Sequence, residues 1–174
     1  TGTRPDKTLP VATVLTLAAS GSETSNSCVL TNEETKEKRG ITSETNRPVI
    51  SFLNPENTFT VSKFQTGCGI VDIMMHTLER YLTPEGGESD LTDRIAEGLL
   101  IATRDAGRRA IADPRDYEAR ATLMWAGSVS HNDYTGCGRK RLFPVHKLEH
   151  ELSAFRDEIA HGAGLSVLFP AWAE

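Results

Sequence analysis

The sequence predicts a fold in two parts, an α/β region followed by an all-helical region. The spacing of apolar residues changes near Val61. Before that point, short runs rich in β-branched residues alternate with polar or proline-containing turns, as in strands. After it, apolar residues recur at three- and four-residue steps, as on one face of an α-helix. A chain of 174 residues that is 38% hydrophobic is also long enough to bury a core.

Three strands are predicted in the first part, over residues 11–17, 27–31 and 49–53. Between the first two lies the small-residue segment 18–25, whose backbone amides and hydroxyls could approach a phosphate or a ribose closely. The glycine spacing of a dinucleotide-binding fingerprint is absent there. A tight connection without a ligand is therefore the alternative interpretation of this segment.

Five helices are predicted in the second part. They cover residues 61–82, 89–111, 117–129, 145–155 and 161–172. The first ends at a breaker that includes residues 84–87, and the second is closed by Asp113 and Pro114. The second part therefore contains no predicted strand.

Composition and charge exclude several classes of partner. The formal net charge of -5 argues against nucleic-acid binding, and the cluster Arg139, Lys140 and Arg141 is interpreted as a loop. No apolar run is long enough to span a bilayer, and three widely spaced cysteines favour a reducing, cytoplasmic setting. The chain lacks an initiator methionine and ends inside an apolar helix. We therefore expect a piece of a longer chain.

An acidic residue and a histidine mark the first helix. Asp72 and His76 are four residues apart, so their side chains lie on one face, one turn from each other. Such a pair can share one metal ion. The alternative is a hydrogen-bonded pair at a packing seam, because buried polar groups usually satisfy each other.

Three more histidines in one short stretch favour the metal. His146 and His150 are four apart, and His161 begins the next helix, where the intervening turn can fold it towards His146. One carboxylate and three imidazoles suit Zn²⁺ or Fe²⁺. The remaining histidine, His131, follows the end of a predicted helix and is interpreted as a capping residue without a chemical role.

Several separated motifs together resemble the iron-containing (group III) alcohol dehydrogenases, and most of all their butanol dehydrogenase branch. The resemblance covers essentially the whole chain in order. Its motifs are residues 9–13 running into 20–23, residues 31–38, the pair Asp72 and His76, residues 146–154 and residues 160–165.

The resemblance implies a fold and a site. Residues 1–60 would be the C-terminal part of a Rossmann-like dinucleotide-binding domain, and residues 61–174 an incomplete helical metal-binding domain, in a dehydroquinate synthase-like architecture. The metal ligands implied for Fe²⁺ or Zn²⁺ are Asp72, His76, His146 and His161. The residues implied to contact NAD or NADP are Thr16, Ser20, Ser22 and Lys38, and His150 is the implied proton relay.

The activity implied by the resemblance is hydride transfer between a nicotinamide cofactor and a small aliphatic alcohol or aldehyde, in a homo-oligomer, expected to be a dimer. One alternative is a metal lyase of the dehydroquinate synthase type, which would combine different metal ligands with a basic, acid-binding pocket. The other is a truncated remnant that binds metal or self-associates without turnover. The sequence leaves open Fe versus Zn and NAD versus NADP.

Overall fold

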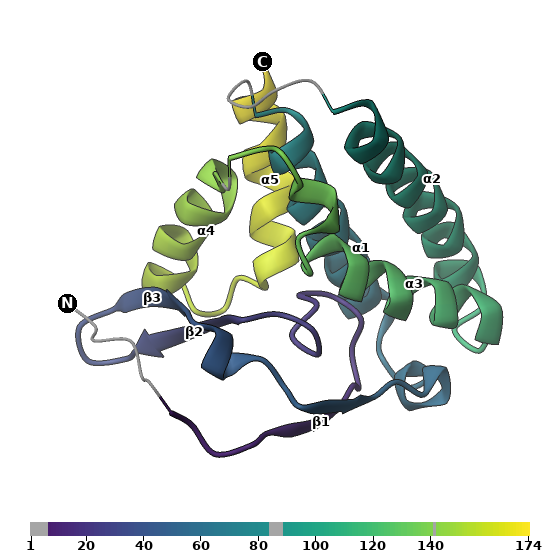
Figure 1. The fold of residues 1–174 in the computed structure, drawn as a ribbon, viewed down its shortest axis with the longest axis horizontal. Helices are drawn as coiled ribbons and strands as arrows, with labels where there is room; N and C mark the ends of the chain where they lie inside the picture. Colours follow the sequence, from purple (N-terminus) through teal and green to yellow (C-terminus); the bar gives the residue numbers. More distant parts are fainter. Residues whose placement is uncertain (1–6, 84–88, 141) are drawn as a thin grey trace.

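The computed structural model describes residues 7–83, 89–140 and 142–174. The predicted breaker at residues 84–87 and Arg141 of the basic cluster lie outside these ranges. Figure 1 shows the long helices gathered on one side of the molecule and the strands along the other side. The two-part fold predicted from the change in apolar spacing is confirmed.

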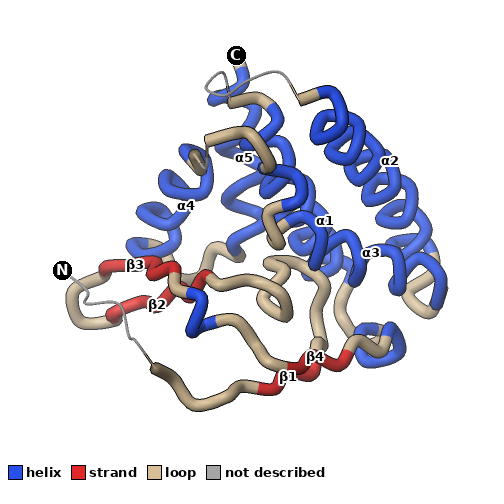
Figure 2. The backbone as a smooth tube through the Cα atoms, viewed as in Figure 1, coloured by secondary structure: helices blue, strands red, loops and turns tan. Residues whose placement is uncertain are grey.

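The strands form two separate pairs (Figure 2). Strand β1 (Ala12–Val14) pairs in parallel with β4 (Ile50–Phe52), and β2 (Ser27–Asn32) pairs antiparallel with β3 (Glu37–Thr42). The three predicted strands are present. Strand β3 was not predicted, because its charged residues give no alternating apolar pattern and its pairing with β2 supplies the order.

All five predicted helices are present, with ends within two residues of those expected. They are α1 (Lys63–Tyr81), α2 (Asp90–Ala112), α3 (Tyr117–Ser130), α4 (Pro144–Phe155) and α5 (His161–Ala173). Short 3₁₀ turns lie at Glu44–Asn46, Pro55–Thr58 and Tyr134–Gly136. Helix α1 begins where the Ser62 hydroxyl accepts the backbone N–H of Gln65 at 3.1 Å, which satisfies a donor that the helix leaves unpaired.

Two apolar clusters hold the helices together. Met75, Val145 and Leu165 join α1, α4 and α5, and each is at most 2% exposed. The second cluster joins α2 and α3 mainly through alanines, whose small side chains allow the helices to approach closely; its buried members are Ala106, Ala110, Ala119 and Leu123. Because α1 packs against α2, α3 and α5, it is the central helix of this part.

The small-residue segment 18–25 lies against α1. A Cβ atom on Gly69 would lie 2.2 Å from the backbone oxygen of Ala18, so only glycine permits this approach. The same helix carries Asp72 one turn later. The segment predicted to face a cofactor is thereby anchored to the helix that bears the first predicted metal ligand.

Across the described parts of the chain, no helix combines the length and the apolarity that crossing a bilayer requires.

Candidate metal centre

The centre of the candidate site is a buried carboxylate on α1. Asp72 is 4% exposed, and His76, one turn later, is 3% exposed. The Nδ1 atom of His76 lies 3.6 Å from Oδ1 of Asp72, and this nitrogen has no hydrogen-bond partner within the described residues. A buried carboxylate beside an unpartnered imidazole nitrogen is unfavourable without a compensating charge.

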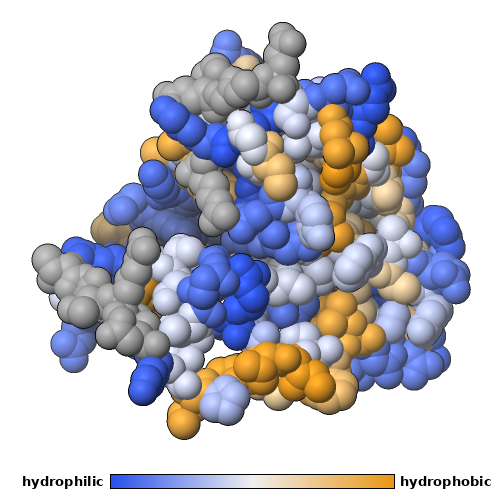
Figure 3. Space-filling view, viewed as in Figure 1, coloured by the Kyte–Doolittle hydropathy of each residue, from blue (hydrophilic) through white to orange (hydrophobic). Residues whose placement is uncertain are grey.

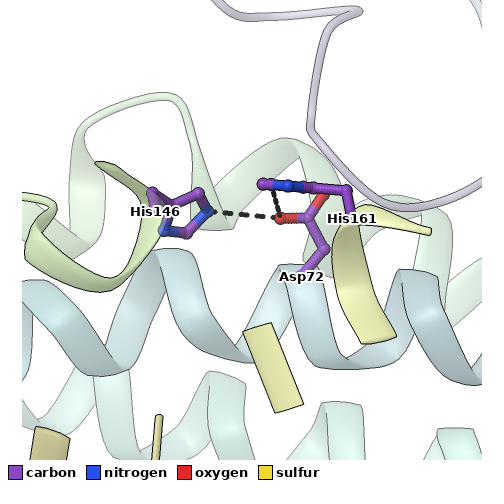
Figure 4. Close-up of side chains that lie close together, drawn as sticks. All are labelled: Asp72, His146 and His161. Atoms are coloured by element: carbon purple, nitrogen blue, oxygen red, sulfur yellow. Dashed lines mark hydrogen bonds and ion pairs between the residues drawn. The ribbon is translucent and has the colours of Figure 1, made fainter. Parts of the chain in front are cut away.

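Helices α4 and α5 bring two further histidines to this carboxylate. Nε2 of His146 lies 3.3 Å from Oδ1 of Asp72, and Nε2 of His161 lies 3.6 Å from the same atom. Figure 4 shows His146 to one side of the Asp72 carboxylate and the ring of His161 over it, with dashed lines from both rings to the same oxygen. Helix α5 can approach α1 this closely because residue 162 is glycine. A Cβ atom there would lie 2.1 Å from the backbone oxygen of Cys68 on α1.

Three of the four predicted ligands form a compact donor set. Donor atoms of Asp72, His146 and His161 all lie within 4.8 Å of one another. His76 is not part of that set. It lies next to it, and its ring stacks on that of His146 with centroids 4.5 Å apart. Residues separated by up to 89 positions in sequence therefore meet at one point.

The surroundings shift the pKa of two of these histidines in opposite directions. Burial lowers the pKa of His76 well below its usual range, and the neighbouring His131 and His146 act in the same direction. Burial also opposes the charge of His146, but hydrogen bonds to Asp72 and Glu79 outweigh it and raise its pKa to about 9. In the metal-free chain, His146 therefore carries a proton that a metal ion must displace.

The chemistry of the donor set fits a divalent cation. Nδ1 of His146 faces the carboxylate of Glu79, and Nδ1 of His161 faces that of Glu149. In a neutral ring, an Nδ1–H directed at a carboxylate leaves the lone pair on Nε2, and the Nε2 atoms of both rings face the same oxygen of Asp72. A cation between these acceptors can replace the proton on His146, and one oxygen with imidazole nitrogens is a ligand set for Zn²⁺ or Fe²⁺.

The two glutamates were not identified from the sequence. Glu79 and Glu149 are each 0% exposed. Each follows a predicted ligand by three residues, His76 and His146 respectively, and this spacing keeps them on the same helix face as that ligand. The repeated His-x-x-Glu pattern was therefore the available signal.

The predicted proton relay and one predicted cofactor residue share a surface hollow. Lys38 of β3 and His150 of α4 line this hollow of about 550 Å³. The Lys38 ammonium donates to the hydroxyl of Ser153 at 2.8 Å. Burial, with the nearby charges of Lys38 and His161, lowers the pKa of His150 to about 4. His150 is therefore neutral near pH 7.

The other three predicted cofactor residues lie elsewhere. Thr16 lines a second hollow of about 480 Å³, together with Val61 and other residues. Ser20 and Ser22 lie on the segment that packs against α1. Among the described residues, Lys38 and Thr16 therefore line two different hollows.

His131 has a contact that the sequence did not predict. It is the C-cap residue of α3, and its backbone N–H lies 3.4 Å from the oxygen of Ser128, so the predicted capping position is confirmed. Its ring, however, packs edge-on against His76 with centroids 4.1 Å apart. It forms one wall of the candidate centre in addition to capping the helix.

Comparison with known proteins identifies relatives for both parts. Residues 66–174 match the family model described as Fe-containing alcohol dehydrogenase family, C-terminal, and residues 1–55 match that of iron-containing alcohol dehydrogenase. An NADH-dependent butanol dehydrogenase A of Clostridium acetobutylicum is 46% identical over 97% of this chain and 43% of its own length. An NADPH-dependent aldehyde reductase of Escherichia coli is 35% identical over 95% of this chain and 43% of its own length.

Solved structures agree with the sequence comparison. The crystal structure of an NADH-dependent butanol dehydrogenase A from Thermotoga maritima superimposes with a TM-score of 0.94 at 42% identity, covering 98% of this chain and 42% of that one. The chain thus spans less than half the length of the relatives it matches.

Proposed function

Since this chain belongs to the iron-containing alcohol dehydrogenase family, we propose that it contributes the metal site of an enzyme that interconverts small aliphatic alcohols and aldehydes with NAD or NADP. The observation that carries the proposal is the convergence of two imidazole Nε2 atoms on one oxygen of buried Asp72. We propose that Asp72, His76, His146 and His161 hold one Fe²⁺ or Zn²⁺ ion. Relatives named for NADH and for NADPH support a nicotinamide cofactor without selecting one.

When bound, the metal ion supplies Lewis-acid polarisation of a substrate oxygen, and the nicotinamide supplies or accepts the hydride. The residues of the chain prepare the site. Asp72 provides the negative charge that retains a cation, and burial keeps His76 neutral, as a ligand must be. We propose that neutral His150 holds or passes the proton that accompanies hydride transfer, since it lies beside His161 with ring centroids 5.4 Å apart.

The cofactor assignments form part of the same proposal. Lys38 lines the same hollow as His150, which favours a contact between Lys38 and the part of the cofactor nearest the proposed metal ion. Thr16, Ser20 and Ser22 are proposed to contact the cofactor on the α/β side. We also propose that residues 1–60 are the end of a dinucleotide-binding domain, and that residues 61–174 are the metal-binding domain.

A second candidate function is a chain that binds metal and self-associates without turnover. The observation in its favour is an apolar strip along β1 and β4, visible as the orange band at the lower edge of Figure 3. Its exposed members include Leu9, Val11, Val14, Ile50 and Phe52. An exposed apolar strip beside a short strand favours association with another copy, as in a dimer.

One experiment separates the two candidates. The purified chain is loaded with Fe²⁺ or Zn²⁺, and nicotinamide absorbance is followed after adding butyraldehyde with NADH or NADPH. Oxidation of the cofactor that disappears in His146→Ala supports the dehydrogenase. Stoichiometric metal binding with no change in absorbance supports the second candidate, and the oligomeric state measured by light scattering then tests self-association.

A further inference from the structure

Two fully buried glutamates lie behind the histidines of the candidate metal centre. Glu79 of α1 and Glu149 of α4 are inaccessible to solvent. An ionised carboxylate in such a position is unfavourable unless hydrogen bonds or an opposite charge compensate its lost hydration. The groups that compensate each glutamate therefore indicate what it does.

Glu79 connects α1 to the first turn of α4. It contacts Nδ1 of His146, and its Oε2 accepts the backbone N–H of Val145 at 2.8 Å. The backbone N–H of His146 also donates to Oε1 at 3.3 Å. These amides belong to the first turn after Pro144, where backbone donors have no partner within their own helix. Glu79 thus fixes both the start of α4 and the ring of His146.

Glu149 lies between the candidate metal centre and the hollow lined by Lys38. Its Oε2 contacts Nδ1 of His161, and the Lys38 ammonium lies 3.8 Å from the same oxygen. Its Oε1 has no hydrogen-bond partner among the described residues. One carboxylate therefore touches a predicted metal ligand and a predicted cofactor residue.

We infer that Glu79 and Glu149 are positioning residues, each of which holds one histidine with Nε2 directed at Asp72. The inference rests on the proposed metal site. A carboxylate that accepts Nδ1–H fixes the ring orientation and the tautomer, and makes the opposite nitrogen a stronger ligand. The Nε2 atoms of His146 and His161 are indeed the ones that face Asp72, at 3.3 and 3.6 Å.

A second cation is the competing explanation for Glu149, because its carboxylate, His150 and His161 offer donor atoms within 4.8 Å of one another. Lys38 argues against it. Its ammonium already supplies a positive charge 3.8 Å from Glu149, and would repel a divalent ion at the same oxygen. The geometry therefore favours a positioning role for this carboxylate.

The test measures Zn²⁺ affinity of the 174-residue chain by competition with a chromophoric chelator. Glu79→Ala and Glu149→Ala should each weaken binding by about 10- to 100-fold. Glu79→Gln and Glu149→Gln should lose less, since the amide oxygen still accepts Nδ1–H. The matched control is Glu23→Ala, which removes a buried carboxylate that is hydrogen-bonded to Ser128 of α3 at 2.5 Å. It should lower thermal stability and leave Zn²⁺ affinity unchanged.

The absorption spectrum of the Co²⁺-loaded chain gives a readout that loss of stability alone does not move. The ligand-field bands should shift in both alanine variants, because weaker donors change the field at the metal, and should stay unchanged in Glu23→Ala. Alanine variants that bind Zn²⁺ as tightly as the wild type overturn the inference. So does binding of two Zn²⁺ ions per chain that falls to one in Glu149→Ala. A wild-type chain that binds no metal overturns both the inference and the proposed metal site.

Discussion

The helical part of this chain buries several ionisable groups around one point, whereas β1 and β4 of the strand part expose a strip of apolar side chains. In the helical part, ionisable groups such as Asp72 and Glu79 are buried, and Val145 is fully enclosed. In the strand part, Val14 is 61% exposed and Ile50 is 50% exposed. Burying charge is unfavourable and exposing apolar surface is unfavourable, so each part retains a feature that folding alone does not favour.

The difference suggests a different kind of binding partner for each part. Buried carboxylates and neutral imidazoles directed at one point suit a small cation, which fits inside the helices. Exposed apolar side chains along short strands suit another protein surface, which covers them from outside. On the proposed function, an ion would complete the site in the helical part, whereas a protein surface would cover the apolar strip along β1 and β4.

Removing the central carboxylate should have the largest effect on this contrast. Asp72→Asn keeps the size of the side chain but removes the negative charge at which the histidines converge. Zn²⁺ affinity should therefore fall by more than the roughly 100-fold that is the upper limit expected for Glu79→Ala or Glu149→Ala. At a free Zn²⁺ concentration about 100 times Kd, the wild type should gain about 2.7 kcal/mol in the free energy of unfolding. Urea titrations with and without Zn²⁺ measure this gain, which should vanish in the variant.

The control for this prediction is Asp105→Asn on α2, an exposed carboxylate that pairs with Arg104. It should bind Zn²⁺ like the wild type.

Amide hydrogen exchange sharpens the contrast between the two parts: Zn²⁺ should protect α1, α4 and α5 more than β1 and β4. Equal protection of the strands would contradict the idea that the ion completes the helical part alone.

Sequence patterns predicted the helices and the Asp72–His76 pair because both depend on local spacing. That His146 and His161 join this pair was expected from the clustering of histidines and from the family resemblance. Periodic apolar residues define α1, and the separation of four places His76 beside Asp72. Strand β3 was missed because it is ordered by pairing with β2, which no local pattern reports. Glu79 was missed for a similar reason: its partners, Val145 and His146, are more than 60 residues away.

A methyl group at the crossing of α1 and α5 should have the next largest effect. In Gly162→Ala, the added Cβ would lie 2.1 Å from the backbone oxygen of Cys68, so α5 must shift and carry His161 away from Asp72. We expect the free energy of unfolding to fall by about 1–3 kcal/mol and Zn²⁺ affinity to fall with it. Thermal or chemical denaturation and the chelator competition measure the two effects.

The chain offers a matched control for that change. Gly98 lies inside α2, and a Cβ atom added there would meet no neighbouring atom within 4 Å, so Gly98→Ala should raise the free energy of unfolding by about 0.5–1 kcal/mol through helix propensity. Zn²⁺ affinity should stay unchanged. If Gly162→Ala behaved like Gly98→Ala, the close crossing of α1 and α5 would not be what places His161.

The last comparison makes the same substitution, valine to threonine, in each part, and the smallest effect should be that in the strand part. Val145→Thr places a hydroxyl in the closed cluster with Met75 and Leu165, and an unpaired buried hydroxyl should cost about 1–3 kcal/mol in the free energy of unfolding. Val14→Thr makes the identical change on an exposed strand where threonine is also favourable, so the effect should stay within about 0.5 kcal/mol.

Repeating the denaturation of Val14→Thr over a range of protein concentrations decides what the exposed strip does. An effect that stays small at every concentration means that Val14 faces water, as in the isolated chain. A penalty that grows with concentration means that another copy covers β1, because only an associated state would then bury the new hydroxyl. The same substitution thus distinguishes an apolar strip that stays exposed to water from one that another copy of the chain covers.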